Sequence, residues 1–277
     1  MISKGSYNIE SLIPIYGIVI EDADLNKDPL NHGSKIAYIA SVPHSGVFIP
    51  EELKRYFSET FLKYHYNSDW FLNELYEFLP ELGFLSVSAD ISRHVIDLNR
   101  DYQGELIGDW GKALIQLRSG MGKQIYQEVP DDKEIQRRIK EYYHPYHQEI
   151  ERLIKSSLDG GKDGVFLIDL HSFGRPLDYD VVLGTRDGES LDADTLDRIK
   201  KLFEEENLRT VVNQYYRGGY ITRHYSKMER VRCLQIELSY NSYISLEVQQ
   251  KPKFDRCEKF VDMQSRLRRI FEKIVCL

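Results

Sequence analysis

The feature that most constrains the fold is an alternation of short apolar runs with longer, charged, helix-like segments. Six runs rich in β-branched residues predict strands at 35–42, 84–90, 164–172, 179–185, 209–215 and 232–239. Such continuous hydrophobicity is typical of strands buried on both faces of a parallel or mixed sheet. Helices are predicted between them, near 68–80, 131–158, 192–206 and 254–275. We therefore expect a single three-layer α/β domain over residues 1–277, with a mixed, mainly parallel sheet.

Two connecting segments carry further local signals. The segment 131–158 begins with aspartates suited to an N-cap and is followed by a glycine pair suited to a C-cap. Pro145 falls inside this pattern, so the helix is expected to be kinked or split there. Residues 101–130 contain five glycines and predict a long surface excursion that can cover a site.

Composition narrows the class of protein. The net charge of −7, with both signs interspersed, argues against a general nucleic-acid binder. No apolar run approaches the length of a membrane span, and the first residues lack a signal-peptide pattern. The three cysteines are widely spaced and form no CxxC pair, which favours a reduced, cytoplasmic protein.

Polar residues near the ends of predicted strands are the first candidates for chemistry. "VPHSG" places His44 two residues after 35–42, and "IDLHS" places Asp169 and His171 on one strand face. "QIELS" places Glu237 between apolar neighbours, where a carboxylate is a candidate general base. Structural readings compete with each: a loop histidine at 44, a core histidine at 171, and a buried salt bridge at 237.

Arginine-rich stretches are the next candidates. "SRHVIDLNRD" (92–101) brings Arg93, Asn99 and Arg100 beside an apolar strand, which suits a carboxylate-binding fork or, alternatively, a surface charge cluster. In "RGGYITRHY" (217–225), paired glycines allow a close backbone approach just before Arg223.

Other histidines and known motifs contribute less. His144 and His147 in "YHPYH" lack the glutamate of HExxH and favour a packing or supporting role, and the role of His224 stays open. GxGxxG, P-loop and GxSxG motifs are absent, which removes the usual nucleotide-binding and serine-hydrolase hypotheses.

Taken in order, these stretches resemble the N-formylglutamate amidohydrolase family from about residue 38 to about residue 245. The resemblance rests on "PHSG", "SDWFLNELY", "SRHVIDLNRD", "YHPYH", "IDLHS", "GGYITRHY" and "LQIELS". It implies a phosphorylase/hydrolase-like, or zinc-carboxypeptidase-like, α/β fold. It also implies metal-dependent removal of formyl from N-formyl-L-glutamate in histidine breakdown.

The resemblance also implies a set of metal ligands. A catalytic zinc takes three protein ligands from His, Asp and Glu, and His44 and His171 fit two of these places. Related carboxypeptidase-like enzymes carry HxxE at the first ligand, but here position 47 is Val47. Asp69 in "SDW" is the candidate third ligand by its match to the family, with Glu51 as a weaker substitute. We expect one Zn²⁺ per chain, or another divalent ion.

The expected mechanism is amide hydrolysis by metal-activated water. Glu237 is the expected general base, and Arg93 is the candidate for stabilising the oxyanion. Asn99 and Arg100 resemble the Asn-Arg pair that holds a substrate carboxylate in carboxypeptidase-like enzymes. Arg223 is the candidate for a second substrate carboxylate. The substrate is then a small acidic N-acyl amino acid, with no nucleic acid or membrane as a partner.

Two other functional classes remain open at this stage. The same chemistry with altered carboxylate pockets would give a hydrolase for another N-acyl amino acid or a peptide-like amide. A non-catalytic binding protein on the same fold is the second alternative.

Overall fold

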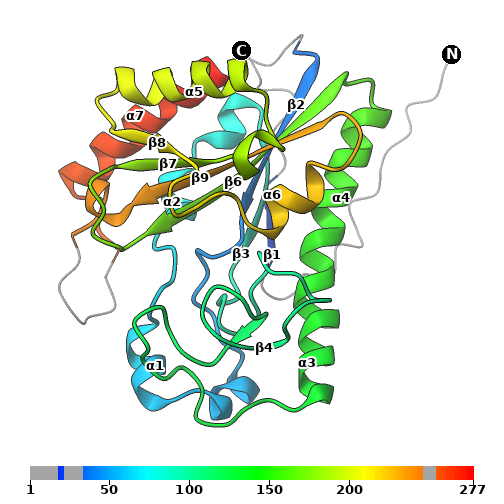
Figure 1. The fold of residues 1–277 in the computed structure, drawn as a ribbon, viewed down its shortest axis with the longest axis vertical. Helices are drawn as coiled ribbons and strands as arrows, with labels where there is room; N and C mark the ends of the chain where they lie inside the picture. The colour runs from blue at the N-terminus through cyan, green and yellow to red at the C-terminus, as the bar shows by residue number, and fades with distance from the viewer. Residues whose placement is uncertain (1–17, 22–33, 246–253) are drawn as a thin grey trace, which may run out of the picture.

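The centre of the molecule is a seven-stranded sheet with the order β1-β3-β2-β6-β9-β7-β8 (Figure 1). The structure is a computed structural model that describes residues 18–21, 34–245 and 254–277. The strands of this sheet are β1 (Ile18–Glu21), β2 (Ile36–Val42), β3 (Leu85–Ala89), β6 (Gly164–Phe173), β7 (Val181–Gly184), β8 (Thr210–Val212) and β9 (Val231–Ser239). The four central strands β3, β2, β6 and β9 are parallel. β1 and β7 run antiparallel to β3 and β9, and β8 is parallel to β7. All six predicted strands and the mixed, mainly parallel sheet are confirmed.

Helices pack on both faces of the sheet and give three layers. The first layer contains α2 (Leu72–Leu75), α5 (Ala193–Glu205) and α7 (Glu258–Ile274), and the second contains α4 (His144–Asp159) and α6 (Tyr220–Tyr225). α3 (Asp132–Arg138) extends the line of α4 below the sheet (Figure 1). Along β6, Ile168 and Leu170 pack into the first apolar cluster and Leu167 packs into the second. This alternation is why the strands are apolar throughout, because each side chain meets a helix layer on one face or the other.

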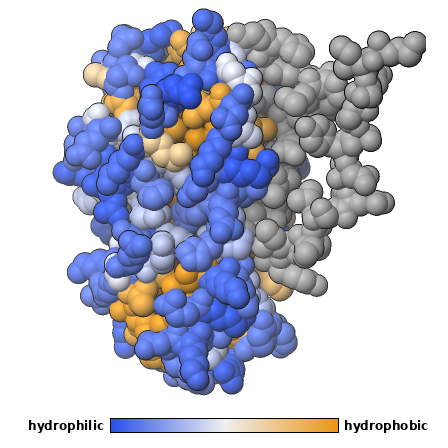
Figure 2. Space-filling model, turned by 90° about the vertical axis from the view of Figure 1, so that its right-hand side faces the viewer, coloured by the Kyte–Doolittle hydropathy of each residue, from blue (hydrophilic) through white to orange (hydrophobic). Residues whose placement is uncertain are grey.

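The interrupted helix pattern at 131–158 is one continuous helical rod. α3 begins at the N-cap Asp131, whose side chain accepts a hydrogen bond from Glu134 N. A π-helical segment, Ile139–Tyr143, then joins α3 to α4. Pro145 supplies no N–H for the bond that a regular α-helix would make, so the chain widens locally instead of breaking. The chain is thus irregular near Pro145 through a change of helix type, and the helix is not split in two as one form of the prediction had it. Figure 2 views this side of the molecule and shows a mostly hydrophilic surface with separate apolar patches.

The segment 68–80 is not the continuous helix that we expected. It contains the single turn of α2 and enters a 3-10 turn at Leu79–Leu82. Phe71, the residue before α2, has a φ of 59°, and Pro80 removes a backbone donor, so a regular helix cannot run through either position. The helices predicted at 192–206 and 254–275 are confirmed as α5 and α7.

The glycine-rich excursion forms a lobe below the sheet in Figure 1, together with α1 (Glu59–Tyr64). It contains the small strands β4 (Ile107–Gly108) and β5 (Ile115–Gln116). Ser58 N donates to Ile125 O at 2.8 Å and ties the two parts of the lobe together.

The remaining 3-10 turns are η1 (Glu51–Tyr56), η4 (Arg186–Gly188) and η5 (Tyr240–Ser242). None of the described helices combines the length and apolar character needed to cross a bilayer.

His147 gives a prediction about stability. On α4, its Nδ1 lies 2.9 Å from Tyr225 Oη and its Nε2 lies 2.9 Å from Leu98 O. Burial lowers the pKa of His147 to about 3, whereas an unfolded histidine has a pKa of about 6.5. Between these values the unfolded chain binds more protons, so the contribution of neutral His147 is complete above about pH 6.5 and is lost as the pH falls.

Urea unfolding at pH 7 and pH 5.5 tests this assignment. His147→Leu should lower the free energy of unfolding by about 1–3 kcal/mol at pH 7, because two buried hydrogen bonds are lost. The penalty should shrink towards pH 5.5, by up to about 1.4 kcal/mol per pH unit. His144→Leu, at a half-buried position on the same helix, is the control for losing an imidazole from α4. An equal His147→Leu penalty at both pH values would contradict the assignment.

Candidate metal centre and active site

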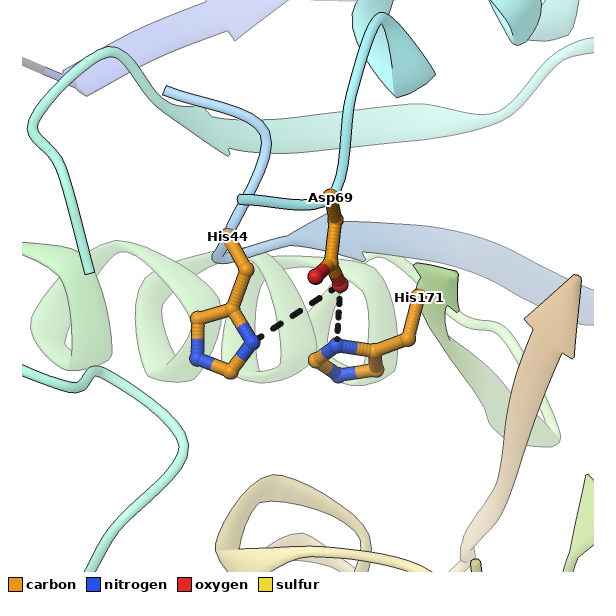
Figure 3. A group of neighbouring side chains, drawn as sticks. All are labelled: His44, Asp69 and His171. Carbon is orange, nitrogen blue, oxygen red and sulfur yellow. Dashed lines mark hydrogen bonds and ion pairs between the residues drawn. The ribbon is translucent and has the colours of Figure 1, made fainter. Parts of the chain in front are cut away.

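Three predicted metal ligands lie together at the carboxyl ends of the central strands. His44 lies two residues beyond β2, His171 lies near the end of β6, and Asp69 lies in the loop before α2. One ligand atom from each residue lies within 4.8 Å of the other two, and all three side chains are buried. Figure 3 shows the Asp69 carboxylate between the two imidazole rings. The parallel pairing of β2 with β6 produces this arrangement, because it brings the two strand ends to one edge.

The backbone around "PHSG" explains the local order of these residues. Asp69 N donates to His44 O at 3.0 Å, so the two loops are joined beside the site. Ser45 Oγ accepts from Leu72 N at 3.0 Å and caps the start of α2. A Cβ at Gly46 would lie 2.2 Å from the Asp90 backbone. The glycine is therefore required for a close approach between two chain segments.

The geometry of the three side chains fits a divalent cation. Asp69 Oδ2 lies 3.0 Å from His171 Nδ1 and 3.8 Å from His44 Nδ1. His44 Nδ1 is buried and has no hydrogen-bond partner among the described residues. A buried, unpaired nitrogen is costly, and a cation between the three groups would satisfy it. Burial and the nearby Arg93 lower the pKa of His44 to about 4, which keeps its imidazole neutral, as a ligand requires.

A second carboxylate holds the far nitrogen of each histidine. His44 Nε2 lies 2.7 Å from Asp97 Oδ1, and His171 Nε2 lies 2.9 Å from Asp169 Oδ2. Such carboxylates fix the tautomer and orientation of metal-binding histidines. Sequence reasoning assigned no role to either aspartate. Asp97 carries the signal that identified Glu237, namely a carboxylate between apolar residues in "VIDL".

Arg93 joins two of these carboxylates. Its Nη2 lies 2.8 Å from Asp97 Oδ2 and its Nη1 lies 3.5 Å from Asp69 Oδ1. The guanidinium packs over the Trp110 ring at 4.8 Å, and Gln116 Nε2 also donates to Asp97 at 2.8 Å. Burial would raise the pKa of Asp97, but the surrounding imidazole and guanidinium groups hold it well below its usual range. The positive charge of Arg93 therefore lies beside the candidate ligand Asp69 and beside Asp97, which orients His44.

Glu237 lies beside the three candidate ligands. It is directly opposite His171 in the parallel pairing of β6 with β9, and it is buried. Gln235 Nε2 donates to Glu237 Oε1 at 3.0 Å. Burial raises the pKa of Glu237 to about 8, and Asp69 contributes in the same direction. A carboxylate with such a pKa can exchange a proton near neutral pH.

Asn99 supports the site from the side of α6. Its Nδ2 donates to Asp169 Oδ2 at 2.9 Å, and its Oδ1 accepts from Ile221 N at 2.8 Å. A Cβ at Gly219 would lie 2.4 Å from Asn99 Nδ2, while Gly218 has a φ of 104°. The close approach that we expected at the paired glycines is therefore present. The predicted contact of Asn99 with substrate stays a prediction.

The two remaining arginines lie at different depths. Arg100 is mostly buried, its Nη1 donates to Asn99 O at 2.7 Å, and its Nε lies 3.9 Å from Asp97 Oδ2. Arg223 on α6 pairs with Asp101 at 3.2 Å, and 43% of its side chain is exposed. Within the described residues, no hydrogen bond or ion pair joins Arg223 to the three candidate ligands. Both substrate-binding roles stay predictions.

The other candidates lie outside the cluster. Glu51 is exposed on η1 and pairs with Lys54, so the geometry favours Asp69 over it. His144 packs against the Tyr102 ring, and His224 stacks on the Tyr220 ring at 4.9 Å.

Comparisons with known proteins identify the family of this chain. The profile of the N-formylglutamate amidohydrolase family matches residues 36–244, more than half of the chain. An N-formylglutamate deformylase of Pseudomonas putida is 28% identical over 233 residues, covering 77% of this chain and 84% of the relative. A deformylase of Pseudomonas aeruginosa is 28% identical over 261 residues, covering 87% and 93%.

A crystal structure shows the same fold. The N-formylglutamate amidohydrolase of Ralstonia eutropha JMP134 superposes with a TM-score of 0.75 at 24% identity, covering 94% of this chain and 97% of that one. A gene product of Agrobacterium tumefaciens superposes with a TM-score of 0.68 at 17% identity, covering 94% of each chain. On the extent of the profile match, this chain belongs to the N-formylglutamate amidohydrolase family.

Proposed function

We propose that this chain is a metal-dependent hydrolase that removes the formyl group from N-formyl-L-glutamate and releases glutamate and formate. The observation that carries the proposal is the convergence of His44, Asp69 and His171, with Glu237 opposite His171. Zn²⁺, one per chain, is the candidate ion because two imidazoles and one carboxylate suit a catalytic zinc. We treat residues 1–277 as a single catalytic domain.

The choice of substrate follows the names of the relatives. The two Pseudomonas proteins are N-formylglutamate deformylases, which are hydrolases, and their substrate is the one we assign here. A place in histidine breakdown is proposed from the family resemblance alone. The three cysteines are free thiols in the structure, which suits the reducing cytoplasm.

In this proposal, two residues of the chain carry out proton transfer and stabilisation of the oxyanion. A bound divalent metal supplies a Lewis acid that polarises the formyl carbonyl and acidifies water. Glu237 removes a proton from the attacking water and transfers it to the departing amine. Arg93 Nε is buried with no hydrogen-bond partner among the described residues, so this donor is available to the developing oxyanion. The proton and the negative charge are thus handled by separate residues.

Three further residues bind the two substrate carboxylates in this proposal. Arg100, with Asn99 beside it, binds the α-carboxylate. Arg223 binds the side-chain carboxylate and exchanges its partner Asp101 for the substrate. Its partial exposure supports this role, because a binding group at the rim must be reachable from solvent.

Glu237→Gln tests the role of the general base. The amide keeps the acceptor for Gln235 but cannot take a proton, so kcat should fall about 10²- to 10⁴-fold with little change in KM. Amine release from N-formyl-Glu, with zinc content measured on the same samples, checks this. Glu204→Gln on the exposed side of α5 is the control and should retain full turnover. A Glu237→Gln rate within a few-fold of the parent would remove Glu237 from the mechanism.

Arg223→Ala tests the substrate. A charged hydrogen bond contributes about 1.5–3 kcal/mol, so kcat/KM for N-formyl-Glu should exceed that for N-formyl-Gln by about ten- to a hundredfold. Arg223→Ala should erase most of this preference in steady-state kinetics on both substrates.

The matched control for that experiment is Arg217→Ala. Arg217 precedes the same glycine pair and forms a comparable ion pair, with Asp187 at 3.0 Å. It should keep the preference of the parent enzyme. Equal hydrolysis of both substrates by the parent would replace the formylglutamate assignment with a broader N-acyl amino acid hydrolase.

A further inference from the structure

The loop that carries Asp69 is held from both sides by tyrosine hydroxyls. Tyr240 Oη donates to Ser68 O at 2.6 Å, and Tyr243 Oη donates to Trp70 O at 2.9 Å. The two acceptors are the carbonyls of the residues immediately before and after Asp69. Because Asp69 belongs to no helix or strand, these bonds replace the support that a regular element would give.

Tyr243 also reaches the strand that carries a candidate ligand. Tyr243 Oη lies 3.0 Å from Ser172 Oγ, and Ser172 N donates to Asp69 Oδ2 at 3.2 Å. Tyr240 is 7% exposed and Tyr243 is fully buried. A buried hydroxyl and a buried carbonyl each need a partner, so breaking one of these bonds leaves two groups unsatisfied. The position of Asp69 is therefore tightly coupled to both hydroxyls.

We propose that Tyr240 and Tyr243 are positioning residues for metal binding, which hold the Asp69 carboxylate in place opposite the two histidines. This inference rests on the proposed metal site and deepens it. Both tyrosines follow Glu237 closely on the same chain segment, so the end of β9 and η5 place the general base and the carboxylate ligand together. With Asp69 already ordered, the metal binds without the entropic cost of fixing a loop.

The experiment compares four Tyr→Phe variants of the full chain, which keep each ring and remove one hydroxyl. Zn²⁺ dissociation constants are measured by competition with a chromophoric chelator. Tyr240→Phe and Tyr243→Phe should each bind zinc about 10- to 100-fold more weakly than the parent, as when a supporting partner of a ligand is lost. At saturating zinc, both variants should recover most of the parent turnover.

Two buried tyrosines of the same apolar cluster serve as controls. Tyr76 Oη has no hydrogen-bond partner among the described residues, so Tyr76→Phe should leave zinc affinity unchanged. Tyr38 Oη donates to Ile274 O at 3.3 Å, away from the strand ends that carry the site. Tyr38→Phe should therefore lower the free energy of unfolding without weakening zinc binding.

A spectroscopic readout separates positioning from general destabilisation. The visible absorption of the Co²⁺-loaded protein should change in Tyr240→Phe and Tyr243→Phe and stay unchanged in both controls. Zinc affinities and Co²⁺ spectra equal to those of the controls would overturn the inference. A parent protein that binds neither ion would instead overturn the proposed metal site itself.

Discussion

The arrangement of the site depends on one buried carboxylate, Asp69, between two imidazoles. Its Oδ2 lies 3.0 Å from His171 Nδ1 and 3.8 Å from His44 Nδ1. A buried carboxylate is not solvated by water, so the surrounding chain has to supply its ion-pair and hydrogen-bond partners. It does so with the two imidazoles, the guanidinium of Arg93 and the backbone N–H of Ser172. The parallel strands bring these groups to one edge of the sheet, and the tyrosines after β9 keep Asp69 there.

Several buried carboxylates gather around this centre. Asp69, Asp97, Asp169 and Glu237 are all buried around it, and Arg93 is a buried cation among them. Asp97 is kept ionised by its positive neighbours, whereas the pKa of Glu237 is raised to about 8 by burial. Carboxylates in one site thus take different roles according to their surroundings, some orienting ligands and one exchanging a proton.

The strands, and the polar residues at their ends, could be predicted from the sequence because they follow a continuous apolar pattern. The six strands are apolar over their full length, and His44, His171 and Glu237 stand out as polar groups at strand ends. Asp69 lies in an irregular loop without periodicity, so only the family resemblance identified it. Gln235, Tyr240 and Tyr243 gave no signal, because their importance lies in hydrogen bonds to groups that folding brings near. The prediction of a helix at 68–80 was wrong. The backbone of Phe71 is in the left-handed region and Pro80 lacks an N–H, so both residues interrupt a segment whose composition is otherwise helical.

The central claim is that the three side chains form a zinc site. Crystals of the protein, soaked in zinc and measured on both sides of the zinc absorption edge, test it most directly. The account predicts one anomalous peak per chain, bonded to His44 Nδ1, Asp69 Oδ2 and His171 Nδ1 at about 2.0–2.2 Å. A peak held by other residues, or no peak between these three side chains at saturating zinc, would contradict it.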